Sequence, residues 1–177
     1  MTDTAVLILR LVLGAILFAH AGQKLFGWFG GNGLTRQAAL FESLGLRPGT
    51  VMVAMAGVME LAAAGLLVLG LVTPLGALVG AGTMLVAGLT MHTASGRFWN
   101  SAGGGEYPYV LCAVAATVGI AGGGRFSADR LLADRWPTLA TWLEPSWIHA
   151  LAIPLLALLS ALPFALLVRR GRTASSS

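Results

Sequence analysis

The sequence predicts an all-α membrane protein, a bundle of about five transmembrane helices with very little soluble mass. Charged residues make up only 10% of the 177 residues, against about 25% in ordinary soluble domains. Hydrophobic residues make up 56%, and the mean hydropathy is +0.81. So few charges cannot cover the surface of a soluble domain of this size. A bilayer removes this difficulty, because lipid tails solvate apolar side chains directly.

Five apolar runs are long enough to be considered as spans, since about 17 to 20 helical residues cross the hydrocarbon layer. They cover residues 4–26, 51–72, 74–91, 107–120 and 148–168. The fourth run is the shortest, and the proline near its start suits the first turn of a helix. The five runs together predict a single transmembrane domain over residues 1–177.

A tight helical hairpin is predicted where the second and third runs meet, at Val72, Thr73 and Pro74. We expect Thr73 to be the N-cap and Pro74 to be the first helical residue. Gly76 and Gly80 follow at a spacing of four, which lets helix backbones approach closely in lipid. We interpret them as packing residues, because a phosphate-binding loop would need a preceding strand and a Lys-Ser/Thr ending.

The longer connections are predicted to lie at the membrane surface. Residues 35–44 alternate apolar and polar positions in the manner of a short interfacial helix, and Trp28 and Phe29 suit interfacial anchors. Residues 131–147 mix charges with tryptophans and form a second interfacial segment. Residues 148–177 then supply an extra transmembrane helix and a basic tail, whose last five residues we expect to be disordered.

The net charge of +4 and the pI of about 10.2 come from scattered basic residues without a basic stripe, so we predict no nucleic-acid partner. We call side B the face reached at the end of the first span, and side A the opposite face. Seven basic residues fall toward side B: Lys24, Arg36, Arg47, Arg97, Arg169, Arg170 and Arg172. Four fall toward side A: Arg10, Arg125, Arg130 and Arg135. This excess predicts that side B, with the C-terminus, faces the cytoplasm.

Six ionisable residues lie within or at the ends of the apolar runs, where charge is costly and side chains usually turn toward the bundle interior. They are Arg10, His20, Lys24, Glu60, His92 and Glu106. Connectivity alone places four of them toward side B, with Glu60 nearer the midplane. The simpler interpretations are that Lys24 and Arg10 extend to the headgroups, that His92 is interfacial, and that Glu60 pairs with Arg10 or Lys24.

The functional interpretation is a polar pocket that handles a proton or a small polar head group. His, Lys and Glu at the edge of an apolar bundle suit a quinone, whose carbonyl oxygens need donors and whose reduction needs protons. Haem held by His20 and His92 is a weaker alternative, because both rings would have to point at one axis. No spacing of Cys and His predicts a metal site, and no catalytic triad is indicated.

Several motifs resemble the DoxX family of small bacterial membrane proteins. The stretch from Gly14 to Gly27, which contains His20 and Lys24, resembles the family's motif at the end of its first helix. Further matches follow in the family's order at Glu60, residues 70–74, His92, residues 103–108 and residues 122–129. The chain departs from the family pattern at Ala21, Gly123 and Ala128, and it adds a fifth apolar run to the usual four helices. Residues 1–130 are therefore taken as the DoxX-like core.

The resemblance implies a multi-pass protein of a bacterial cell membrane. Relatives include the membrane subunit of a thiosulfate:quinone oxidoreductase, so it implies a quinone-facing subunit of a redox complex, with protein partners besides the lipid bilayer. It places His20, Lys24, Glu60, His92 and Glu106 in a pocket for quinone and protons, and it gives Arg125 and Asp129 the ordering of a surface turn. Two alternatives remain open: a non-catalytic anchoring subunit of a larger membrane complex, and a proton or solute pathway suggested by Glu60.

Overall fold

The structure, a computed structural model, describes the backbone of residues 2–175 and the side chains of residues 2–170. That part of the chain is helical and contains no strand, so the predicted fold class is confirmed. Four helices are long and apolar enough to cross a membrane: α1 (Thr2–Leu25), α3 (Gly49–Leu69), α4 (Thr73–Ser95) and α8 (Trp147–Ser175). The fourth predicted run is α5 (Glu106–Ala121), whose 16 residues give a length of only about 24 Å.

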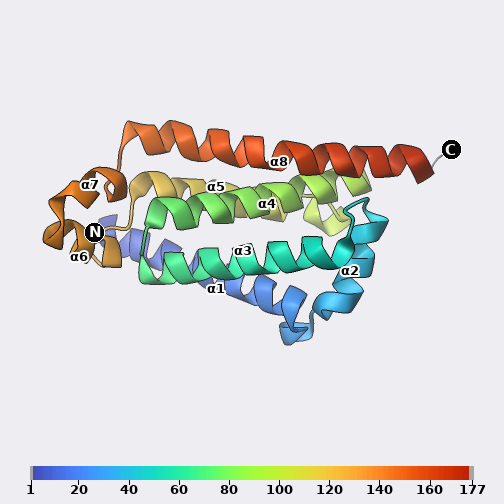
Figure 1. Cartoon of the computed structure of the whole chain (residues 1–177), viewed down its shortest axis with the longest axis horizontal. Coiled ribbons are helices and arrows are strands. Elements are labelled where there is room, and N and C mark those ends of the chain that lie inside the picture. The colour runs from blue at the N-terminus through green and yellow to red at the C-terminus, as the bar shows by residue number, and fades with distance from the viewer. Residues whose placement is uncertain (1, 176–177) are drawn as a thin grey trace.

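The five helices lie side by side, and α4 occupies the central position of the bundle (Figure 1). It packs against α3, α5 and α8, while α1 packs mainly against α3 and also contacts α5. The two ends of the chain lie at opposite ends of the bundle (Figure 1), as an odd number of crossings requires. The core between these helices is apolar and includes Leu13, Leu17, Leu67, Met84 and Val118.

Small residues allow the helices of this core to approach closely, which confirms the packing interpretation of the glycines in α4. A Cβ atom on Gly76 would lie 2.7 Å from the Cβ of Leu66, and one on Gly80 would lie 3.2 Å from Leu17. About two turns further along, a Cβ on Gly88 would lie 2.6 Å from the ring of Tyr109. The glycines of α4 thus receive side chains from three neighbouring helices.

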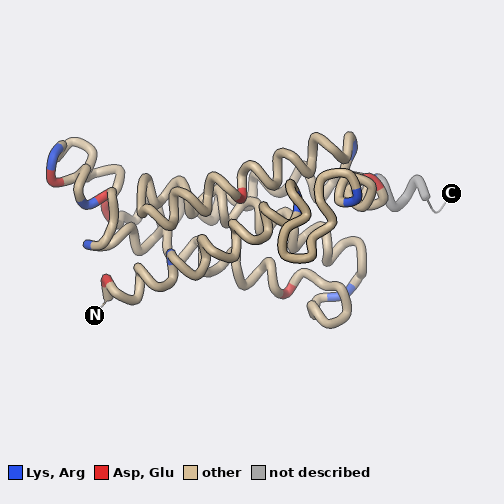
Figure 2. The backbone as a smooth tube through the Cα atoms, turned by 90° about the horizontal axis from the view of Figure 1, so that it is seen from below, with Lys and Arg blue, Asp and Glu red and all other residues tan. Residues whose placement is uncertain are grey.

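The predicted surface segments are short helices at the two ends of the bundle. On side B, η1 (Trp28–Gly30) and α2 (Gly33–Ser43) follow α1, and α2 lies across the end of the bundle (Figure 1). On side A, α6 (Ala128–Arg135) and α7 (Pro137–Leu143) connect α5 to α8. Most acidic and basic residues are at these two ends, with few along the middle (Figure 2).

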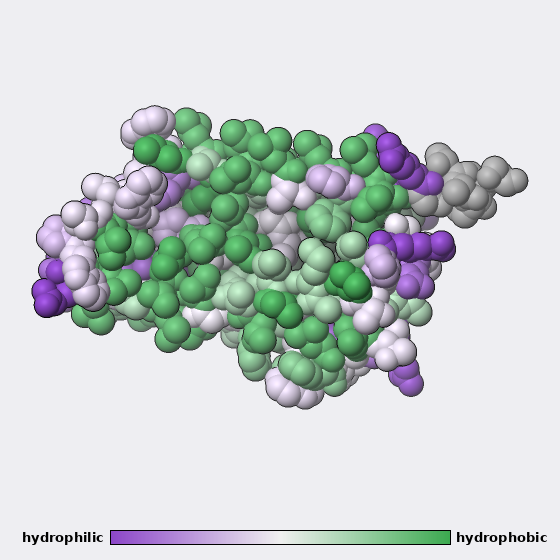
Figure 3. Space-filling model, viewed as in Figure 1, coloured by the Kyte–Doolittle hydropathy of each residue, from purple (hydrophilic) through white to green (hydrophobic). Residues whose placement is uncertain are grey.

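The loop before α5 contains a further short helix, η2 (Asn100–Ala102), on side B. The prediction of disorder from Thr173 differs from the structure, because helical backbone continues to Ser175; residues 176–177 lie outside the described part. Between the polar ends, hydrophobic residues cover the visible face of the bundle (Figure 3). On α8 alone, Leu151, Leu155 and Leu158 are each more than half exposed, as a lipid-facing surface requires.

Candidate functional site

The register between α1 and α3 brings the end of α1 beside the middle of α3. Leu25 in the last turn of α1 packs onto Gly57, where a Cβ atom would lie 2.6 Å from Leu25 Cγ. Gly57 is near the middle of α3, so the last turn of α1 lies well inside the bundle. Because of this offset, Lys24 faces the interior at the depth of Glu60.

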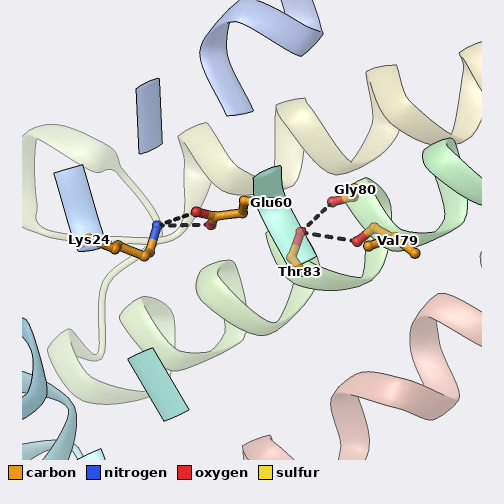
Figure 4. Close-up of polar contacts among 5 residues, drawn as sticks. All are labelled: Lys24, Glu60, Val79, Gly80 and Thr83. Carbon is orange, nitrogen blue, oxygen red and sulfur yellow. Dashed lines mark hydrogen bonds and ion pairs between the residues drawn. The ribbon is translucent and has the colours of Figure 1, made fainter. Parts of the chain in front are cut away.

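Lys24 and Glu60 form an ion pair at this position (Figure 4). The Lys24 Nζ atom donates to both carboxylate oxygens of Glu60, at 2.8 Å and 2.9 Å. The Glu60 side chain is 2% exposed and the Lys24 side chain 16%, so Lys24 turns inward and does not extend to the headgroups. Of the two partners considered for Glu60, the structure selects Lys24. The pair compensates both charges, which neither helix could bury alone.

A polar pocket of about 300 Å³ opens beside this ion pair. It lies between the last turns of α1, the loop after η1 and the start of α2, and it is lined by His20, Gln23, Lys24, Gly30, Gly31, Asn32 and Gln37. Gly31 is essential to its shape, because a Cβ there would lie 2.4 Å from the Cα of Gln23. Two of the amides are bonded to each other, since Asn32 Nδ2 donates to Gln37 Oε1 at 2.9 Å, and both NH2 groups keep further N–H donors.

The two histidines lie on different sides of α5. The ring of His20 is 6.0 Å from that of Tyr107, and the ring of His92 is 6.4 Å from that of Tyr109, measured between centroids. Residues two apart on a helix point about 200° apart, so the histidines flank opposite sides of the first turn of α5. His20 lines the pocket, whereas His92 does not.

Glu106 also lies apart from the Lys24 pocket. Its Oε2 atom accepts a hydrogen bond from the backbone N–H of Asn100 at 3.1 Å, and its own N–H donates to the Phe98 carbonyl at 3.0 Å. These contacts close the loop that contains η2. Of the five pocket residues expected from the resemblance, the structure therefore groups His20, Lys24 and Glu60, and places His92 and Glu106 beside the neighbouring loop.

A second polar cluster lies at side A, around Arg10. This residue is 1% exposed, and its guanidinium donates to backbone carbonyls. The Leu67 and Val68 oxygens accept at 2.9 Å and 3.2 Å, Phe126 accepts at 3.1 Å, and Gly123 also accepts. Arg10 therefore joins the last turn of α3 to the loop after α5. Neither expected role holds, because Arg10 neither extends toward the headgroups nor pairs with Glu60.

Asp129 completes the side-A cluster by capping α4. Its Oδ1 and Oδ2 atoms accept the N–H groups of Val72 and Thr73 at 2.6 Å and 2.8 Å. The expectation that Thr73 caps its own helix is wrong, because α4 begins at Thr73 and no side-chain hydroxyl caps it. Asp129 therefore orders the α3–α4 hairpin. Arg125 contributes differently: its N–H donates to Asp3 at 3.0 Å, and its guanidinium lies 5.1 Å from the Phe126 ring centre.

Sequence reasoning missed the amide residues of the pocket, Gln23, Asn32 and Gln37. The available signal was that Gln23 directly precedes Lys24 and that Asn32 and Gln37 lie on the connection that follows, but this connection was interpreted as an interfacial surface. Within the described residues, the structure contains no group of three or more His, Cys, Asp and Glu side chains able to hold a metal ion.

The family model described as DoxX matches residues 5–93, just over half of the chain. The matched part contains the whole ion pair and its pocket, together with His92, whereas the side-A loop of residues 122–129 lies beyond it. No curated protein and no solved structure matches the chain.

Proposed function

The chain belongs to the DoxX family, and from that premise we propose that it is the membrane subunit of a redox complex. In this proposal, the pocket beside Lys24 receives a quinone head group. The observation that carries the proposal is the ion pair with Glu60 that holds Lys24 at the wall of a polar pocket. A charge-compensated Lys–Glu pair of this kind places a proton donor and a proton acceptor inside an apolar bundle.

The pocket's residues fit a quinone by their chemistry. The lining offers an ammonium group, an imidazole and three amides, which can donate to the two carbonyl oxygens of the ring. A quinone accepts two electrons and two protons when it is reduced. The electrons are assigned to a partner subunit, and this chain supplies the binding site and the protons.

Each residue then has a defined part. Glu60 holds Lys24 Nζ through both carboxylate oxygens, so the ammonium group is oriented at the pocket wall. Lys24 donates a hydrogen bond to one carbonyl oxygen of the ligand. His20, four residues earlier on the same face of α1, is placed to exchange protons between the ligand and the surface, since an imidazole ring can both donate and accept a proton.

The test is the quinone content of the protein after extraction in a mild detergent. The wild-type protein is expected to retain quinone, and Lys24→Met is expected to lose it. Glu60→Gln should weaken retention, because the amide no longer orients the ammonium group. Arg36→Gln is the control, since Arg36 is exposed on α2 and lies outside the pocket. A quinone-free wild-type protein, together with unchanged behaviour of Glu60→Gln in the intact complex, would exclude the proposal.

The second candidate is a non-catalytic anchoring subunit, favoured by the outer face of α8. Leu151, Leu155 and Leu162 form part of an exposed apolar surface on this helix, which packs against α4 and α5. A partner's transmembrane helix can pack on such a surface. Mass analysis of everything that copurifies after gentle extraction tests this role: partners without quinone favour anchoring over the redox proposal, and a stable protein without partners contradicts the anchoring role.

A further inference from the structure

An apolar groove of about 670 Å³ opens on the opposite wall of α3 from the ion pair. Its walls are α3 and α8, and its floor is α4. Met52, Met55 and Met59 line the α3 side, and Gly82 and Thr83 line the floor. Both hydroxyls near the floor, those of Thr83 and Ser160, donate to carbonyls of their own helices. The groove therefore presents an apolar surface with unbranched, adaptable methionines on one wall.

The dimensions of the groove suit a flexible hydrocarbon chain better than a protein helix. The lining residues of α4 and of α8 each extend over nine residues, so the first and last are about 12 Å apart along the helix at 1.5 Å per residue. A spanning helix would need contact along about 30 Å. At side B the groove ends against Phe41 and Leu46, next to α2, which lies across the end of the bundle (Figure 1). A straight helix would meet this obstruction.

A basic residue follows the groove's lining at side B. Leu46 is followed directly by Arg47, which is exposed. Figure 3 shows hydrophilic side chains at the same end, where the hydrophobic face stops. Glu42 is the acidic residue nearest to Arg47 along the chain, and its carboxylate accepts the N–H of Gly49 at 3.0 Å.

From this arrangement we infer that the groove holds an acyl chain of an anionic phospholipid from the side-B leaflet. The hydrocarbon chain lies between α3 and α8 on the floor of α4. The phosphate lies at the headgroup boundary, where Arg47 is available as a counter-charge. The site is independent of the quinone pocket, which lies on the α1 side of α3.

Native mass spectrometry of the full chain, released from detergent, tests the inference with two probes that have identical dioleoyl chains. Phosphatidylglycerol is expected to be retained in preference to phosphatidylcholine. Arg47→Gln should lower that preference about fivefold. Arg97→Gln, which removes an exposed arginine of the α4–α5 loop, should leave the preference unchanged.

Filling the groove tests the hydrocarbon part. Leu159→Trp is expected to abolish long-lived retention of both lipids, because Leu159 lines the groove. Leu158→Trp is the matched control, since Leu158 is equally exposed (54% against 52%) but lies outside the lining. Met55→Trp repeats the test from the α3 wall, with Val58→Trp as its control.

Three outcomes would overturn the inference. Equal retention of both lipids by the wild-type protein removes the anionic preference. Unchanged retention in both groove-filling variants, shown to be folded by their thermal unfolding, removes the groove as the binding place. If the wild-type protein is a dimer and Leu159→Trp dissociates it without changing lipid retention, the groove belongs to a second copy of the chain.

Discussion

At the residue scale, the buried charges of this protein are compensated in two different ways. Arg10 is satisfied by backbone carbonyls of two segments, whereas Lys24 is satisfied by a single carboxylate. The first arrangement joins parts of the fold. The second places two titratable side chains next to a pocket, so a change in either residue alters both stability and the pocket.

Removing one member of the Lys24–Glu60 pair is expected to destabilise the protein much more than removing both members. Lys24→Met leaves the carboxylate of Glu60 buried without its partner, which costs about 3–5 kcal/mol. The double variant Lys24→Met/Glu60→Met removes both charges and should recover most of that loss. Thermal unfolding of the purified variants in one detergent measures the difference. A double variant as unstable as the sum of the two single variants would contradict this account.

Gly70 is expected to tolerate no side chain, because of Arg10. Gly70 has a φ of +62° and Gly96 a φ of +66°, so an alanine meets the same backbone strain at both sites, about 1–2 kcal/mol. A Cβ on Gly70 would contact the Arg10 guanidinium, whereas nothing lies within 4 Å at Gly96. Gly70→Ala should therefore lower the melting temperature further than Gly96→Ala. Equal shifts would show that Arg10 moves aside without cost.

At the scale of elements, the short helix α6 stabilises the long helix α4. Asp129 on α6 accepts two N–H groups at the start of α4, and its own N–H donates to the Gly70 carbonyl at 2.8 Å. A carboxylate at a helix N-terminus also interacts favourably with the helix dipole. The α3–α4 hairpin thus depends on a segment that follows it by more than fifty residues.

Asp129→Ala is expected to destabilise the protein by at least about 1–2 kcal/mol, the usual cost of losing an N-cap. Asp134→Ala, on the same short helix, is the control. It removes an exposed ion pair with Arg130, in which both side chains are 55% exposed, and such pairs contribute about 0–1 kcal/mol. Chemical or thermal unfolding of both variants provides the comparison. A larger loss for Asp134→Ala would refute the capping role.

The sequence was sufficient to predict the elements because their signals are local. The apolar runs predicted all five long helices, and Pro74 marked the start of α4. The contacts between elements were not local. The cap from Asp129 joins residues 56 positions apart, and the offset that buries Lys24 depends on Leu25 meeting Gly57. The hydrophobic periodicity of the sequence does not encode the offset between two helices. The sequence was therefore equally consistent with a Lys24 side chain that extends to the headgroups.

At the scale of the whole molecule, the two ends of the bundle differ in charge. Side B has an excess of lysine and arginine, of which Arg36, Arg47 and Arg97 are exposed in its connections. On side A, Arg10 is buried among carbonyls, and Arg130 is paired with Asp134. On side B, Lys24 is likewise buried in its ion pair with Glu60. Setting aside Arg10 and Lys24 leaves six basic residues on side B against three on side A, so the count still predicts that side B is cytoplasmic.

This orientation can be measured with single cysteines in intact cells. Cys112, the chain's one cysteine, is first replaced by serine, and cysteines are then introduced at Ser101 or at Thr138. Both positions are exposed, but Ser101 lies in η2 on side B and Thr138 lies in α7 on side A. A membrane-impermeant thiol reagent should label Thr138→Cys and leave Ser101→Cys unlabelled until the cells are opened. The reverse pattern would place side B outside and would contradict the charge argument, whereas labelling of both in intact cells would mean mixed orientations.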